Sequence, residues 1–421
     1  MSQAGKKLCR AKLPLMIVLP WLSFLFCAPV QAQSSDWTQW GGPHRNFVSD
    51  VKGLADAWPA GGPRQLWKRE LGEGYSSIVV DNGKLYTLYR KDEQEVVIAL
   101  DAASGKTIWE HPYPAPIHYE FKFGPGPRAT PLIIGNSIFT VGASGIFHCL
   151  DKQTGKAIWS HDLLKEFNGY EQEHLYASSP LAYKNTVIVP VGAEGGSIMA
   201  FNQKDGAVVW KKLDFKTGYA APILITVDGQ EQVVAFMEDD IIGINPNNGD
   251  LLWSHPHKAN TSVNSSTPIW GNDNLLFCSS AYDGGSRMLK LAHKGDKTTV
   301  EEVWYQRLMR MHFSIVMRIG DVLYGSSGDF GPTPFTAVDA KTGKVLWRDR
   351  SVSKVEIIYA DGKFIMLDED GNLILAKPTA EGLKIISQAP ILVNNAWTPP
   401  TLAGTKLYAR DRKMIVAVDL K

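Results

Sequence analysis

The sequence is poor in cysteine, in net charge and in long apolar runs, and each shortage narrows the possible functions. Cys9 and Cys27 lie near the start of the chain, and the other two of its four cysteines are Cys149 and Cys278. We expect these two to be buried free thiols that lie too far apart for a disulfide. The formal net charge is +1, so the chain offers little electrostatic attraction to a nucleic acid. Beyond the first thirty or so residues, no segment is long and apolar enough to cross a bilayer.

Motifs that carry chemistry are also scarce. Glu171, Glu173 and His174 share one loop, but two carboxylates two residues apart do not define a metal site. The pair Asp239 and Asp240 is more typical of a hairpin tip than of paired catalytic acids. The glycine pairs fall in hairpins and do not open helices, which argues against a phosphate-binding loop. The sequence therefore assigns no catalytic residue, no metal ligand and no cofactor ligand.

What the chain does have is a repeat, Asp-x-x-(Ser/Thr)-Gly-Lys-x-x-Trp. Its clear copies are Asp101–Trp109, Asp151–Trp159 and Asp339–Trp347, and weaker ones are Asn202–Trp210 and Asn245–Trp253. Trp67 and Trp304 stand in degenerate copies. Successive tryptophans of this series fall 42 to 51 residues apart, which is the length of a four-stranded propeller blade.

Each copy is typical of two antiparallel strands joined by a tight turn. In the second copy, Gly155 stands where such a turn needs a positive φ, which glycine adopts at little cost. The Asp151 carboxylate is placed to accept hydrogen bonds from the turn amides. Trp159, at the start of the return strand, can pack against a neighbouring blade and donate its indole N–H to a carbonyl.

Small residues, often followed by proline, precede each predicted innermost strand, and they mark eight blades. These begin near Tyr75, Arg128, Ser178, Tyr219, Asn264, His312, Lys354 and Trp397. The Lys354 unit lacks the tryptophan, so seven blades is the alternative. The last unit ends before its outer strand, while the segment Arg64–Leu71, with Trp67, reads as an outer strand without a blade. We therefore predict an all-β, eight-bladed propeller of four-stranded antiparallel blades, closed when this N-terminal strand completes the C-terminal blade.

The start of the chain has the pattern of a targeting segment. Basic residues precede an apolar stretch from 13 to 28, and Val30-Gln31-Ala32 is a small-x-small cleavage site. We predict a signal peptide at 1–32, an N-terminal extension at 33–63 and the propeller at 64–421. The protein would then be exported and become periplasmic or extracellular after cleavage near Ala32, peripheral to a membrane at most. An uncleaved anchor is the alternative, while Phe26 argues against lipidation of Cys27.

The unit Ala337–Trp347 resembles the repeat of the pyrroloquinoline quinone (PQQ) type propellers, and Asp36–Asn46 is similar to the Trp-x-x-Tyr/Phe-Gly-Gly opening of such secreted proteins. The resemblance implies one of two functions. Quinoprotein dehydrogenases bind PQQ and calcium on the propeller axis, and usually have a vicinal cysteine pair, a catalytic aspartate and long insertions. The propeller of the outer-membrane protein assembly machine instead binds partners through surface loops.

This chain has no Cys-Cys pair, short connections and no aspartate in a matching context. The resemblance therefore favours a non-catalytic scaffold that binds a protein partner in the cell envelope. A PQQ-dependent alcohol or sugar dehydrogenase, with PQQ and calcium on the axis, is the alternative.

Three long loops lead to predicted innermost strands, at 111–128, 161–176 and 255–264. Such loops reach one mouth of the axial channel, where propellers usually bind ligands. The candidate residues in them are Arg128, His118, Tyr119, Glu173, His174 and Tyr176. Arg128 directly precedes an axial strand and could hold a carboxylate through two hydrogen bonds. The alternative is that all six cap the channel and satisfy loop amides.

Overall fold

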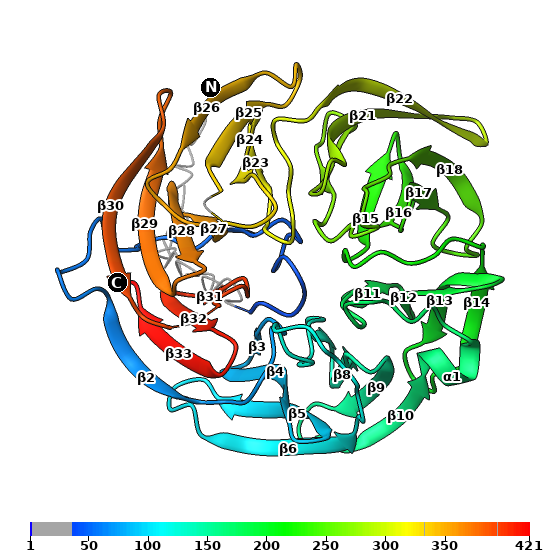
Figure 1. Ribbon diagram of the computed structural model, residues 1–421, viewed down its shortest axis with the longest axis horizontal. Helices are drawn as coiled ribbons and strands as arrows, with labels where there is room; N and C mark the ends of the chain where they lie inside the picture. Colours follow the sequence, from blue (N-terminus) through cyan, green and yellow to red (C-terminus); the bar gives the residue numbers. More distant parts are fainter. Residues whose placement is uncertain (2–35, 332, 394) are drawn as a thin grey trace. The chain divides into compact units, whose positions relative to one another are not determined.

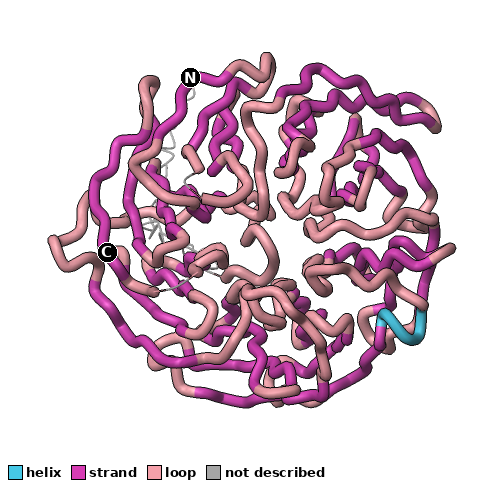
Figure 2. Tube along the Cα trace, viewed as in Figure 1, coloured by secondary structure: helices cyan, strands magenta, loops and turns pink. Residues whose placement is uncertain are grey.

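The computed structural model describes Met1 and residues 36–331, 333–393 and 395–421, so the predicted signal peptide, apart from Met1, lies outside the described residues. Residues 36–421 belong to one folded unit, in which eight sheets are arranged in a ring, each a four-stranded blade and one of them extended by the short strand β1 (Figures 1 and 2). The eight-bladed propeller is confirmed, and the seven-bladed alternative is wrong. In the part of the chain that is described, no helix is long and apolar enough to cross a membrane.

In each blade the strands follow one another from the axis to the rim. Blade 1 contains β3 (Val79–Asp81), β4 (Lys84–Lys91), β5 (Gln94–Asp101) and β6 (Thr107–Pro114). Blade 2 contains β7 (Leu132–Ile134), β8 (Ser137–Val141), β9 (Ile146–Asp151) and β10 (Ala157–Asp162), followed by the short helix α1 (Leu163–Phe167). Blade 3 contains β11 (Leu181–Tyr183), β12 (Thr186–Ala193), β13 (Gly196–Asn202) and β14 (Val208–Lys212). Blade 4 contains β15 (Ile223–Val227), β16 (Gln230–Phe236), β17 (Asp240–Ile244) and β18 (Leu251–Pro256).

The second half of the chain repeats this order. Blade 5 contains β19 (Ile269–Trp270), β20 (Leu275–Ser280), β21 (Gly285–Lys294) and β22 (Lys297–Gln306). Blade 6 contains β23 (Met317–Ile319), β24 (Val322–Ser326), β25 (Phe335–Asp339) and β26 (Val345–Asp349). Blade 7 contains β27 (Val355–Ala360), β28 (Lys363–Asp368), β29 (Asn372–Pro378) and β30 (Leu383–Pro390), with β1 (Val48–Ser49) parallel to β27. Blade 8 contains β31 (Thr401–Ala403), β32 (Lys406–Arg410), β33 (Met414–Asp419) and β2 (Arg64–Glu70).

The middle strands of the blades are buried on both faces because a neighbouring blade covers each face. In β5, six successive residues from Glu95 to Leu100 are buried, and most of them are aliphatic. The outer strand β6 instead alternates, with buried Trp109 between exposed Ile108 and Glu110. The core therefore lies between the sheets, and the indole is the main group through which an outer strand reaches the next blade.

The indole of one blade is joined to the turn of the next. Trp109 Nε1–H donates to the carbonyl of Lys152 at 3.1 Å, and a Cβ atom on Gly155 (φ +71°) would lie 2.5 Å from the Trp109 ring. Asp151 fixes this turn by accepting from the Thr154 N–H at 2.8 Å, as predicted. The same indole-to-carbonyl bond joins Trp67 to Ala102, Trp159 to Gln203, Trp210 to Pro246, Trp304 to Ala340, and Trp347 to Thr379.

Trp253 departs from this pattern. Its indole N–H donates to Gln232 Oε1 at 2.7 Å, within its own blade. The next blade has the long hairpin of β21 and β22, whose turn near Gly295 does not carry the Asp-x-x-Thr-Gly-Lys sequence. The Trp253 N–H bonds within its own blade because the neighbouring blade has no turn of this kind whose carbonyl could accept the hydrogen bond.

The ring closes through the N-terminal strand, as predicted. β2 pairs with β33 along its length, with Trp67 opposite Ala417, and Figure 1 shows blue β2 beside red β33. Trp67 then bonds to blade 1 like the other tryptophans. Arg410 of β32 strengthens this junction: it is fully buried and donates to the Leu88 carbonyl at 2.7 Å.

Residues 36–50 cross one end of the channel. The Trp37 N–H donates to the Val80 carbonyl of blade 1, the Thr38 carbonyl accepts from Ile133 of blade 2, and β1 then pairs with blade 7. In Figure 1 this dark blue segment reaches the centre of the ring. The N-terminal extension therefore seals the end of the channel opposite the three long loops.

Near the axis, neighbouring blades are linked by small hydroxyl side chains. Ser76 Oγ–H donates to the Ala129 carbonyl at 2.7 Å, and Ser178 Oγ–H to the Ala220 carbonyl at 2.9 Å. Between blades 6 and 7 the link is a carboxyl group, because Glu356 Oε2 accepts from the Ile315 N–H at 3.1 Å. Burial raises the pKa of Glu356 to about 8, and nearby Lys354 only partly opposes this.

We expect Gly155→Ala to destabilise the fold more than Gly83→Ala. Both glycines have nearly the same φ, +71° and +72°, but nothing lies within 4 Å of a Cβ at Gly83. The positive φ alone costs about 1–2 kcal/mol, and displacing the Trp109 ring adds about 1–3 kcal/mol. Urea denaturation followed by tryptophan fluorescence measures the difference. Equal losses in the two variants would show that the indole contact adds nothing.

We expect Glu356→Gln to change how stability depends on pH. Between the unfolded pKa of about 4.3 and the folded value of about 8, the native state holds a proton that the unfolded chain has released. Wild-type stability therefore falls through this range, by at most about 1.4 kcal/mol per pH unit from this group. The advantage of the variant in free energy of unfolding should grow from pH 5 to 8. The exposed Glu301→Gln is the control, and an advantage independent of pH contradicts the prediction.

Candidate functional site

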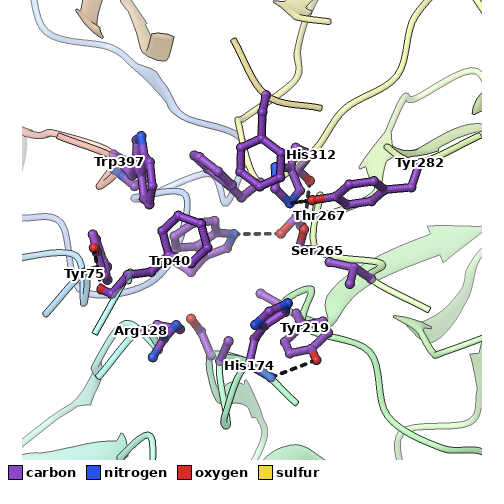
Figure 3. A pocket seen from close by; sticks show the side chains of 18 of the residues that line it. Trp40, Tyr75, Arg128, His174, Tyr219, Ser265, Thr267, Tyr282, His312 and Trp397 are labelled. Atoms are coloured by element: carbon purple, nitrogen blue, oxygen red, sulfur yellow. Dashed lines mark hydrogen bonds between the residues drawn. The ribbon is translucent and has the colours of Figure 1, made fainter. Parts of the chain in front are cut away.

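A cavity of about 200 Å³ lies on the axis of the ring (Figure 3). Seven of the eight blades line it, each through the residue that precedes the small residue of its inner strand: Tyr75, Arg128, Ala177, Tyr219, Ser265, Phe313 and Trp397. In four blades the residue two positions further on also lines it: Ser179, Ala221, Thr267 and Pro399. This spacing follows from the two-residue period of an extended chain.

The floor of the cavity comes from the N-terminal extension. The Trp40 indole lies at the centre in Figure 3 and donates Nε1–H to Thr267 Oγ1 at 3.1 Å. Phe47 supports it, with ring centroids 5.1 Å apart in an edge-to-face arrangement. Glycine is needed beside this floor, because a Cβ on Gly42 would lie 2.7 Å from the Trp37 ring. The Trp-x-x-Trp-Gly-Gly segment at residues 37–42 thus closes one end of the cavity.

An aromatic wall surrounds Trp397. Its ring lies 5.7 Å from that of Tyr75 at an interplanar angle of 22°, and 5.4 Å and 5.2 Å from those of Phe123 and Phe313. Phe330 extends this wall toward the mouth, stacked parallel to Phe123 at 6.1 Å. The wall is therefore rigid and apolar, and it presents ring faces and edges to the cavity.

Arg128 is the one charged side chain among the described residues that line the cavity. It donates to the carbonyls of Gly126 at 2.7 Å and Gly124 at 3.0 Å, and to the Tyr119 hydroxyl at 3.3 Å. The guanidinium also lies over the rings of Tyr119 and Tyr75, 5.3 Å and 5.9 Å from their centroids. Burial lowers the pKa of Arg128, but an arginine remains protonated at neutral pH.

Two histidines in the lining are neutral at neutral pH. Burial lowers the pKa of His312 to about 3 and also lowers that of His174. His312 Nε2 shares a hydrogen bond with the Tyr282 hydroxyl at 3.2 Å, and His174 Nδ1 lies 3.4 Å from the Tyr119 hydroxyl. The histidines therefore contribute polar contacts to the cavity and leave its positive charge to Arg128.

The structure brings three of the six candidate residues together. Arg128, Tyr119 and His174 line the cavity. His118 is exposed and pairs with Glu120 at 3.1 Å, and Glu173 is also exposed. Tyr176 is buried against the core of blades 2 and 3 and donates its hydroxyl to the Pro190 carbonyl at 2.8 Å.

Several cavity residues were not identified as candidates from the sequence. These are Trp40, Tyr75, Tyr219, Tyr282, His312, Phe313, Phe330 and Trp397. The sequence does carry a signal for four of them, because Tyr75, Tyr219, Phe313 and Trp397 all stand directly before the small residues of an inner strand. Reading that position across all blades would have found these four aromatic side chains.

The residues of the cavity do not fit PQQ with calcium. No aspartate or glutamate lines the cavity in the described part of the chain, and no group of three or more His, Cys, Asp or Glu side chains there could hold a metal ion. Calcium requires six to eight oxygen ligands, mainly carboxylates and carbonyls. Cys149 and Cys278 are free and buried, as predicted.

Comparison with known proteins places this chain among propellers of two kinds. It is 23% identical over 279 residues to the outer membrane protein assembly factor BamB of Yersinia pestis, covering 64% of this chain and 68% of that protein. It is 30% identical over 154 residues to the quinoprotein alcohol dehydrogenase PedH of Pseudomonas putida, which covers 33% of this chain but only 25% of the dehydrogenase. The structure of the quinohemoprotein alcohol dehydrogenase ADHIIG of Pseudomonas putida HK5 superposes with a TM-score of 0.61.

The superposition on ADHIIG covers 92% of this chain and 80% of the dehydrogenase at 12% identity, so it shows a shared fold and nothing about chemistry. The family described as outer membrane protein assembly factor BamB matches residues 93–349, which is more than half of the sequence. This matched region runs from the second hairpin of blade 1 to the end of blade 6. The chain therefore belongs to the family of the outer membrane protein assembly factor BamB.

Proposed function

We propose that this protein is an exported, non-catalytic propeller that binds a protein partner of the cell envelope through the loops at the open mouth of its axial cavity. The observation that carries the proposal is the asymmetry of the channel. One end is sealed by residues 36–50, whereas the other presents long loops with aromatic side chains on a rigid ring. Rigid scaffolds that hold variable loops are a common architecture for binding sites.

Exposed apolar side chains at the mouth support this choice. Phe121 and Phe330 are 39% and 56% exposed. Phe330 itself lines the cavity, and Phe121 lies in the loop that contributes Tyr119 and Phe123 to the lining. Val393, in the loop that leads from blade 7 to blade 8, is also exposed. Aromatic groups of this kind are enriched where proteins bind proteins.

Two further lines of support come from outside the mouth. The basic and apolar start of the chain, with its small-x-small site near Ala32, is typical of a secretory signal. The BamB relatives are named as factors of outer membrane protein assembly, and we carry over from them the expectation of a protein partner in the envelope.

The rim is the competing surface for a partner. Outer strands expose aliphatic side chains beside the buried tryptophans, as Ile108 and Ile158 do. Blades 1 and 2 each expose one such residue in the outer strand, and blade 3 exposes two neighbouring ones, Val208 and Val209. Single apolar residues scattered over a surface are ordinary, so the mouth is the stronger candidate.

The second candidate function is a quinoprotein oxidoreductase, favoured by the similarity to part of PedH and by the axial position of the cavity. Purified protein incubated with PQQ and calcium should then acquire a visible chromophore and dye-linked dehydrogenase activity. We expect neither, because no described residue of the cavity lining carries a carboxylate. Stoichiometric chromophore formation with activity would favour the enzyme over the scaffold.

We expect a photo-crosslinking amino acid at Phe121 or Phe330 to capture an envelope protein in cells that produce this chain. The same amino acid at Ile158, which is 51% exposed on the rim, is the control and should capture far less. Irradiated cells are analysed by gel shift and mass spectrometry of the adducts. A defined adduct from Ile158 alone would show that the partner binds the rim, and the proposal that it binds at the mouth would then be wrong.

A further inference from the structure

The guanidinium of Arg128 has no counter-ion among the described residues. Its oxygen partners are the carbonyls of Gly124 and Gly126 and the Tyr119 hydroxyl, all of them neutral. A guanidinium has five N–H donors, and these three bonds, two from Nη2 and one from Nη1, leave the Nε–H and one Nη1–H of this cavity-lining residue. Burying part of a cation without a paired carboxylate costs free energy. The cavity therefore favours a ligand that brings a carboxylate to pair with Arg128.

The polar side of the cavity suits a carboxylate. One of these two Arg128 donors can give a charge-assisted hydrogen bond to a carboxylate oxygen, whereas both hydrogens of Nη2 are already used by Tyr119 and Gly124. No acidic side chain of the described lining would repel such a group. His174 lies near Tyr119 on this side of the cavity, and Tyr219 supports its backbone with a hydrogen bond of 3.3 Å. Figure 3 shows Arg128 and His174 on the same side of the cavity floor.

The wall that adjoins this side through Tyr75 suits an aromatic ring. Trp397, Tyr75, Phe123 and Phe313 form a continuous wall with centroid separations of 5.2 to 5.7 Å around Trp397. Aromatic rings stack or pack edge to face at such distances. A dry cavity of about 150 Å³ holds one benzene molecule. The volume here, about 200 Å³, therefore accommodates one ring with a short acid chain.

We propose that the axial cavity is a binding site for an aromatic carboxylate, with the ring against Trp397 and the carboxylate on Arg128. The ligand is either a small free acid or the C-terminal carboxylate of a peptide that ends in an aromatic residue. Both sources offer the same ring and the same anion. The inference does not depend on the envelope partner, because the cavity would bind a small acid even if the mouth bound no protein.

The test uses the mature protein and 3-phenylpropionate, followed by calorimetry and by tryptophan fluorescence. The neutral 3-phenylpropionamide has the same ring and nearly the same shape, and acetate has the charge without the ring. We expect the acid to bind about 10- to 100-fold more tightly than the amide, which is the effect of a charge-assisted hydrogen bond. Acetate should bind more weakly than the aromatic acid. Equal affinities for acid and amide would overturn the proposal.

Two variants locate the site. Arg128→Gln should lower the affinity for 3-phenylpropionate about 10- to 100-fold and leave the affinity for the amide unchanged. Phe330→Ala should weaken both aromatic ligands and leave acetate unaffected. Leu308→Ala, 59% exposed and outside the cavity lining, is the matched surface control. Unchanged binding of the acid by a folded Arg128→Gln protein contradicts the proposal, and if that variant does not fold, the acid and amide comparison on the wild type decides.

A second arm distinguishes the two sources of the carboxylate. A tripeptide ending in phenylalanine is titrated with its terminus free and with its terminus amidated. Binding of the free peptide at least about tenfold more tightly than 3-phenylpropionate identifies a peptide terminus as the ligand, and weaker binding identifies a small acid. Failure of both the free peptide and the small acid to bind overturns the inference, while photo-crosslinking at Phe121 reports separately on the envelope partner.

Discussion

The ring of blades is held together by one contact, in which the tryptophan indole of one blade bonds to and packs against the turn of the next blade. It needs three features together: a flat side chain with a donor at its edge, a turn carbonyl to accept from it, and a glycine whose missing Cβ leaves room for the ring. Trp109, Lys152 and Gly155 supply these at the first joint. Because a blade cannot bury its own faces, this contact converts separate four-stranded sheets into one folded body. Closure through β2 adds the last such joint, from Trp67 to blade 1.

The same arrangement creates the cavity. Inner strands converge on the axis, so small hydroxyl residues such as Ser76 and Ser178 must link them. Extended chains alternate their side chains, and the residue just before each small one therefore points into the channel. Large side chains fit at these positions, because only the open mouth of the cavity lies above them. The ring fixes the positions of the side chains that line the cavity. The identity of the residue at each position then determines what the cavity binds.

The sequence predicted the ring well and the cavity only in part. Turn chemistry and repeat spacing are local, so residues such as Gly155 and Trp67 were sufficient to predict eight blades and their closure. The cavity depends on convergence across seven blades and on Trp40, which reaches the axis from the N-terminal extension. Tyr176 shows the limit of reading loops by composition. Its loop contains α1 and folds back on blades 2 and 3, so the tyrosine is buried away from the mouth.

The electrostatics of the cavity favour binding over proton transfer. A general acid or base works best when its pKa lies near the working pH, yet burial holds the pKa of His312 at about 3 and lowers that of His174. Glu356 has a pKa of about 8, but it is buried in the inner strand β27, accepts a hydrogen bond from the Ile315 N–H and does not line the cavity. What faces the cavity is a fixed positive charge on Arg128 and a rigid aromatic wall. Such a site discriminates by charge and shape, because neither feature changes between pH 5 and 8.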